Sequence, residues 1–201
     1  MVHGSPRVNG NSNYLLQQLV DATIAELPPG TAVVEHIHTA RLKAKPCISC
    51  GGCDTTGQCV IMDEMQEVYT KVRQADLLLI GSPVFFASVS AQLKAVIDRF
   101  QAAWVAKYKL KRPWLSPGNG RRAALICVGG MTEERHYRQT RSVIRAWLAT
   151  LNWELTRGLW LPGIDARGDA AKIDGIDATI QALAKVLTAP APPDPTTPDG
   201  T

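Results

Sequence analysis

The chain alternates short apolar runs with longer segments in which apolar residues recur at helical spacing. The short runs are rich in β-branched residues, leucine and alanine, and they predict strands near residues 1–3, 31–38, 76–81, 122–129 and 153–160. The amphipathic segments predict helices near residues 12–27, 63–74, 89–104, 133–151 and 168–187. Strands that alternate with helices imply parallel crossover connections, so the pattern predicts a doubly wound α/β sheet with helices on both faces.

The length of 201 residues favours one domain followed by a tail. We assign residues 1–187 to the domain, with a cysteine-rich loop at 45–60. Residues 188–201 contain repeated proline and few apolar residues, which predicts a disordered tail. Only three residues precede Gly4, so we expect the first strand to be truncated and Met1 not to be the true start.

Composition narrows the classes of function. Hydrophobic residues make up 45% and charged residues 20%, which is ordinary for a globular protein with a real core. The net charge of +4 is small and the basic residues are dispersed, so a nucleic acid is not expected as partner. No apolar run approaches the roughly 20 residues that cross a bilayer, and no secretory signal is visible. We therefore expect a cytoplasmic protein without a membrane partner.

The carboxyl ends of the predicted strands are the places to look for a ligand site, because parallel sheets bind ligands there. The loop after the first strand, GSPRVNGNSN, precedes a helix, whose N-terminus attracts anions. Asn11 or Ser12 is the expected N-cap. The loop lacks the spacing of nucleotide-hydrolysing and dinucleotide-binding motifs. Phosphate binding and simple helix capping both remain possible roles for its donors Ser5, Arg7, Asn11 and Ser12.

A second loop, after the third strand, combines a tight turn with apolar side chains. Such a surface suits an isoalloxazine ring, which needs apolar contacts for its faces and backbone groups for its edge. The alternative is that the aromatic residues only cover the core. The residues concerned are Ser82, Pro83, Val84, Phe85 and Phe86. Gly129 and Gly130, after the fourth strand, would let a third loop approach the same ring.

Taken in this order, the motifs resemble those of the NADPH-dependent FMN reductase branch of the flavodoxin-like superfamily. The matching stretches are residues 4–13, 47–65, 75–100 and, more loosely, 128–130. The resemblance implies a five-stranded flavodoxin-like sheet and a homodimer or homotetramer with FMN near the subunit interfaces. It also implies that Ser5, Arg7, Asn11 and Ser12 hold the FMN phosphate, while residues 83–86 flank the flavin ring.

Four cysteines follow the pattern C-x2-C-x2-C-x5-C, and successive x2 spacings are typical of iron–sulfur ligands. Zinc sites usually place two C-x2-C pairs far apart, so zinc fits less well. The four thiols could instead stay free or form a disulfide. The motif resembles that of archaeal iron–sulfur flavoproteins, which implies a [4Fe–4S] cluster near FMN. The ligands would be Cys47, Cys50, Cys53 and Cys59. His36 and His38 are expected at the edge or surface of the sheet rather than as a metal pair, since no nearby carboxylate completes a site.

Together these features predict an FMN-dependent oxidoreductase without a catalytic acid or base of its own. Its electron donor would be ferredoxin or NAD(P)H, and its acceptor a small molecule such as a quinone or a flavin. Two different functions stay open. One is that of a non-catalytic electron carrier like a flavodoxin, and the second is that of a thiol or metal redox sensor.

Overall fold

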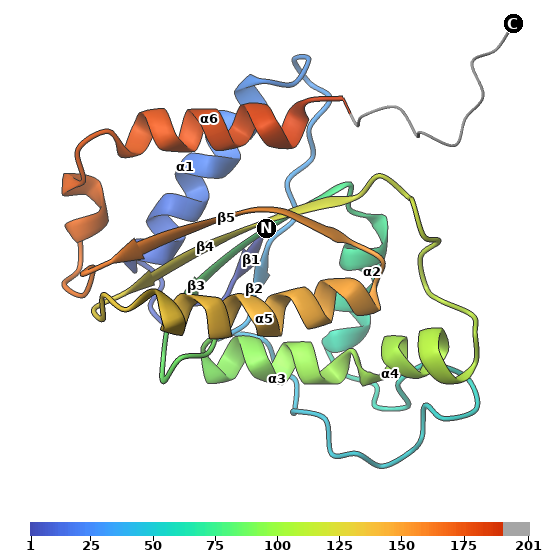
Figure 1. The fold of residues 1–201 in the computed structure, drawn as a ribbon. Coiled ribbons are helices and arrows are strands. Elements are labelled where there is room, and N and C mark those ends of the chain that lie inside the picture. Colours follow the sequence, from blue (N-terminus) through green and yellow to red (C-terminus); the bar gives the residue numbers. More distant parts are fainter. Residues whose placement is uncertain (191–201) are drawn as a thin grey trace, which may run out of the picture.

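The computed structural model describes residues 1–190 and contains one parallel sheet of five strands (Figure 1). The strand order is β2-β1-β3-β4-β5, with every neighbouring pair parallel, which confirms the predicted doubly wound architecture. The predicted tail lies almost entirely outside the described residues. The strands are β1 (Val2–His3), β2 (Ile37–His38), β3 (Leu77–Pro83), β4 (Arg122–Gly129) and β5 (Glu154–Pro162).

Helices cover both faces of the sheet (Figure 1). A π-helical turn, Val105–Lys109, continues the fourth helix, and a 3-10 turn, Asp169–Lys172, precedes the last. Among the described residues, no helix has the length and apolar character needed to cross a membrane. The helices are α1 (Asn11–Ala25), α2 (Met65–Gln74), α3 (Ala91–Arg99), α4 (Gln101–Trp104), α5 (Glu134–Thr150) and α6 (Ile176–Thr188).

The core is divided into two layers by the sheet. Side chains alternate along a strand, so Leu125 of β4 packs in the layer with α2, α3 and α5, while Ile126 packs with α1 and α6. Both residues are completely buried, which contributes about 1.5–3 kcal/mol each. Burial on both faces explains why β3 and β4 are continuous apolar runs rather than alternating ones.

Three predicted boundaries were wrong for physical reasons. The strand predicted at 31–38 forms ladder pairs only at Ile37 and His38, because its one neighbour, β1, has two residues. The N-cap of α1 is Gly10 rather than Asn11 or Ser12. The last helix begins at Ile176 instead of 168, because Gly175 precedes it with a φ of 73°. Short as it is, β1 pairs on both sides and occupies an interior position in the sheet.

Candidate functional site

The loops after β1, β3 and β4 meet in one cavity of about 300 Å³ at the carboxyl edge of the sheet. This volume lies at the lower end of the range for ligand pockets. Of the residues predicted to bind FMN, Ser82 is the one that does not line the cavity, because it lies within β3 and is completely buried. The predicted residues that line the cavity are Ser5, Arg7, Asn11, Ser12, Pro83, Val84, Phe85, Phe86, Gly129 and Gly130.

The first loop presents the N-terminus of α1 to this cleft. The N–H groups of Asn13 and Tyr14 donate to the carbonyl of Gly10, whereas those of Asn11 and Ser12 have no backbone acceptor among the described residues. Free N–H groups and the positive end of the helix dipole favour an anion here. The exposed side chain of Arg7 lines the same cleft and adds positive charge.

The side chain of Asn11 has a structural role that the sequence did not reveal. Its amide nitrogen donates to the carbonyl of Ala166 at 2.8 Å. Its oxygen accepts hydrogen bonds from the N–H groups of Gly168 and Ala170 at 3.0 and 3.3 Å. Asn11 therefore ties α1 to the segment after β5, and it offers a ligand its backbone N–H rather than a free amide.

The β3 loop closes in a tight turn with strained backbone. Phe85 and Ser88 exchange two backbone hydrogen bonds of 2.9 and 3.0 Å, which leaves Phe86 and Ala87 as a two-residue turn. Both turn residues have positive φ, 48° and 60°, as a type I′ turn requires. This conformation costs a non-glycine residue about 1–3 kcal/mol. Such strained residues are typical of functional loops. The turn holds the Phe86 ring fully exposed at the rim of the cleft.

The third loop comes close to the second because Gly129 has no side chain. A Cβ atom there would lie 3.0 Å from the Trp160 ring and 3.4 Å from Cβ of Val84. At Gly130 a Cβ would make only an ordinary contact of 3.4 Å with Asp165. Close packing of this loop against its protein neighbours therefore depends on Gly129 in particular.

The segment after β5 also lines the cleft, and the sequence analysis missed it. Asp165 and Arg167 belong to this segment. The rule that located the first three loops, the carboxyl end of a parallel strand, also applies to β5 and could have identified it. The cleft therefore carries two arginines, Arg7 and Arg167, and one carboxylate. Further lining residues that were not predicted are Ala87, Met131, His136, Trp160 and Ile164.

The cysteine loop forms a second cavity of about 180 Å³, which all four predicted cysteines line. In Figure 1 the loop runs below α3 and α4, away from the carboxyl edge of the sheet. Two contacts hold it there: the Trp114 indole donates to the carbonyl of Gly57 at 2.9 Å, and Lys109 pairs with Asp54 at 3.1 Å. The two cavities share no lining residue.

Arg99, at the end of α3, joins the two ends of the cysteine loop. Its guanidinium donates to the carbonyl of Lys45, at the start of the loop, at 2.8 Å. After the loop it binds both carboxylate oxygens of Asp63, at 2.7 and 3.0 Å, and reaches the Sγ atom of Cys59 at 3.4 Å. Burial alone would raise the pKa of Asp63, but the hydrogen bonds and the charge of Arg99, together with backbone hydrogen bonds such as that from Met65, outweigh burial and hold this pKa below its usual value.

The donor set of the loop fits a polynuclear cluster better than a single metal ion. Among the described residues, no three of the four cysteine sulfur atoms all lie within 4.8 Å of one another. Sulfur atoms around one tetrahedral Zn²⁺ would be roughly 3.8 Å apart, given Zn–S bonds of about 2.3 Å. None of these cysteines forms a disulfide. Thiolates are the usual ligands of iron–sulfur clusters, so the residues present fit a [4Fe–4S] group.

Comparison with known proteins decides the family. Residues 1–153 match the family of NADPH-dependent FMN reductases. The chain belongs to the NADPH-dependent FMN reductase family. This membership agrees with the family suggested by the sequence motifs, and it identifies the chain as part of an FMN-dependent oxidoreductase family.

Iron–sulfur flavoproteins are among the curated proteins that this chain resembles. One from Methanocaldococcus jannaschii is 42% identical over 98 residues, which are 49% of each chain. One from Archaeoglobus fulgidus is 38% identical over 96 residues, 48% of this chain and 42% of the relative. This chain therefore spans about half the length of each of these curated relatives.

Solved structures support the same fold. An FMN-dependent NADH-azoreductase from Bacillus anthracis, solved in complex with FMN, aligns with a TM-score of 0.66 at 17% identity, covering 94% of this chain and 97% of that one. A NAD(P)H:quinone oxidoreductase from Methanothermobacter marburgensis aligns with a TM-score of 0.64 at 16% identity, covering 94% of each chain. At such identities the likeness establishes the flavodoxin-like fold alone.

Proposed function

We propose that this member of the FMN reductase family binds FMN in the cleft and transfers electrons between a reduced donor and a small acceptor. The donor would be NAD(P)H or ferredoxin, and the acceptor a quinone or a flavin. The observation that carries the proposal is the convergence of three loops on one cavity, where the first loop contributes the N-terminus of α1 and the second contributes apolar side chains. FMN matches this lining, because it carries a charged phosphate at one end and a largely apolar ring at the other.

Different residues of the cleft would bind different parts of FMN. The free N–H groups at the start of α1, with Arg7, would hold the phosphate. Val84 and Phe85, from the β3 loop, would cover the ring and keep water from it. When bound, FMN supplies the chemistry, because it exchanges both hydride and single electrons. The chain's own contribution is to bind and orient the cofactor.

The cysteine loop would hold the [4Fe–4S] cluster as a one-electron group. Its four thiols line one cavity together with Arg99 and Lys109. The guanidinium of Arg99, 3.4 Å from Sγ of Cys59, would donate a hydrogen bond to one of the cluster ligands. The iron–sulfur flavoproteins among the relatives support this part of the proposal.

A second copy of the chain is the proposed partner, as a homodimer or homotetramer. The exposed Phe86 ring and Met131 lie at the rim of the cleft. Apolar side chains on such a rim would be covered by another subunit or by the substrate. Sedimentation of the purified protein as a dimer or tetramer is the expected result, and a monomer at micromolar concentration would exclude this partner.

Steady-state turnover tests the enzymatic part of the proposal against a passive carrier. FMN-loaded protein should oxidise NADPH or NADH, or reduced ferredoxin, continuously when a quinone or free flavin is present. Arg7→Ala should lower turnover at limiting FMN and recover it at saturating FMN, because the arginine acts on cofactor binding. One reduction event per bound flavin, without further turnover with any of these donors, would identify a carrier instead.

A further inference from the structure

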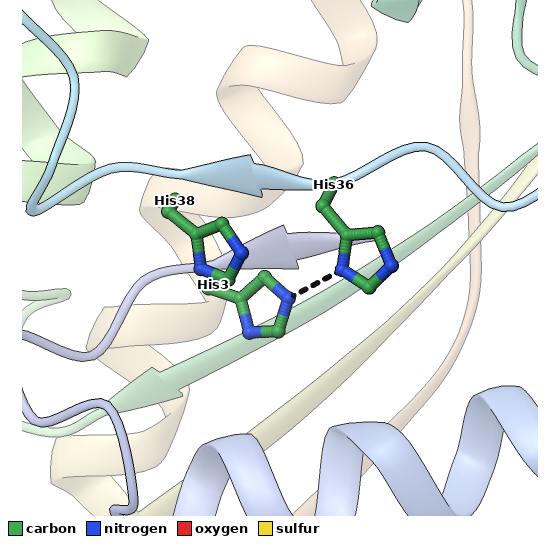
Figure 2. Close-up of side chains that lie close together, drawn as sticks. All are labelled: His3, His36 and His38. Atoms are coloured by element: carbon green, nitrogen blue, oxygen red, sulfur yellow. Dashed lines mark hydrogen bonds between the residues drawn. The ribbon is translucent and has the colours of Figure 1, made fainter.

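Three histidines, from β1, from β2 and from the residue just before β2, meet at one side of the sheet (Figure 2). His3 ends β1 and is paired in register with His38, the last residue of β2. His36 lies two residues before His38, so side-chain alternation brings it to the same face. The backbone N–H of Thr39 donates to the carbonyl of His3 at 3.1 Å, which fixes this register. The sequence placed His36 and His38 at the edge of the sheet, but it did not reveal their contact with His3.

The spacing of the ring nitrogens suits metal coordination. Nε2 of His3 lies 3.2 Å from Nδ1 of His36 (dashed in Figure 2). Two imidazole nitrogens bound to one tetrahedral Zn²⁺ would be about 3.3 Å apart, given Zn–N bonds of 2.0–2.1 Å. One nitrogen from each of the three rings lies within 4.8 Å of the others. Two of the three potential ligands are therefore already at ligand spacing.

Hydrogen bonds behind His3 determine which of its nitrogens is free. The amide nitrogen of Asn13 donates to the carbonyls of Arg7 and Val8, both at 3.0 Å, which turns its oxygen toward His3. That oxygen lies 3.3 Å from Nδ1 of His3 and accepts its proton. Nε2 is then left with a lone pair that points at His36. Histidine ligands of metals are usually oriented in this way, by a hydrogen bond from the second ring nitrogen.

His3 is buried, whereas His36 is exposed and His38 is partly exposed. Burial, and secondarily the neighbouring His38, lower the pKa of His3 to about 4, so the ring carries no charge at neutral pH. His36 and His38 line a surface cavity of about 180 Å³. The ammonium of Lys71 in that cavity is paired with carboxylates of Glu35 and Glu67 at 3.0 and 2.8 Å, which offsets its repulsion of a cation.

We propose that His3, His36 and His38 form a binding site for a divalent transition-metal ion, with Zn²⁺ the best match. Imidazole nitrogens are preferred ligands of Zn²⁺, Ni²⁺ and Cu²⁺. The rings of His3 and His38 are now stacked, with centroids 4.0 Å apart and planes at 16°. Binding requires His36 and His38 to rotate about their side-chain torsions, and their exposure at the cavity permits this. A water molecule would complete a tetrahedral site with three protein ligands.

Imidazole NMR of the full chain with ¹⁵N-labelled histidine tests this site without interference from the cysteines. The protein has four histidines, and the fourth, His136, lies in the cleft and serves as internal control. Zn²⁺ should shift the ring nitrogens of His3, His36 and His38 together and to saturation within a fivefold excess, while those of His136 stay in place. Zn²⁺ held only by thiols would leave all four rings unchanged.

Substitution of the two more accessible histidines, His36 and His38, completes the test. His36→Ala and His38→Ala should each weaken Zn²⁺ binding at the remaining rings by at least about tenfold. His136→Ala should leave the affinity unchanged. Unshifted cluster rings at a fivefold excess of Zn²⁺ would overturn the proposal. Equal shifts of all four histidines, or unchanged affinity after both cluster substitutions, would overturn it as well.

Discussion

Removing the charge of Asp63 from its buried ion pair with Arg99 should lower the stability of the protein more than removing the charge of Arg99. The Arg99 side chain is 1% exposed, whereas that of Asp63 is 15% exposed. Asp63→Asn leaves a guanidinium buried without its carboxylate, which costs about 3–5 kcal/mol. Arg99→Met leaves a carboxylate that can still reach water, and we expect a smaller loss of about 1–3 kcal/mol. Leaving the more deeply buried charge without its partner therefore costs more free energy of unfolding.

Urea unfolding of the reduced, cofactor-free protein measures both losses without the contribution of bound ligand. The double variant should lose less stability than either single variant, because it leaves neither charge buried without its partner. Lys94→Met, which removes an exposed pair with Asp98, is the matched control and should cost about 0.5 kcal/mol or less. Equal losses for the two single variants, or strictly additive losses in the double variant, would refute this reasoning.

Three further predictions concern the cleft. Gly129→Ala should weaken FMN binding severalfold by fluorescence titration, since its Cβ would lie 3.0 Å from Trp160, whereas Gly130→Ala should bind FMN normally. Ala87→Gly should raise stability by up to about 1 kcal/mol in thermal unfolding, because Ala87 has a φ of 60°; an unchanged midpoint would show that the turn is not strained. Arg7→Ala should weaken FMN binding by roughly tenfold or more while riboflavin binding stays constant, and an equal loss for riboflavin would contradict phosphate recognition.

The sequence pattern predicted an element correctly where a single physical cause determines that element. The run at 122–129 corresponds residue for residue to β4, because a strand buried on both faces must be apolar throughout. The same reasoning placed the loops of the cleft, since the carboxyl ends of parallel strands lie at one edge.

Features that depend on pairing between distant segments were not visible in the sequence. The contact of His3 with His36 and His38 requires the register of β1 on β2. Arg99 looked like an ordinary charged residue near a helix end, yet it is buried against a loop that lies more than 35 residues earlier. Asn11 has the chemistry of a phosphate donor, but the segment after β5 takes up its side chain.

Cofactor analysis of anaerobically purified protein tests the central claim most directly. We predict flavin bands above broad iron–sulfur absorption, with about one FMN and about four irons per chain. Cys50→Ala should keep the FMN and lose the iron, while Cys127→Ala, in the buried strand β4, should keep both. A protein without flavin would contradict the proposed cofactor, and iron content unchanged by Cys50→Ala would contradict the assignment of the cysteine loop.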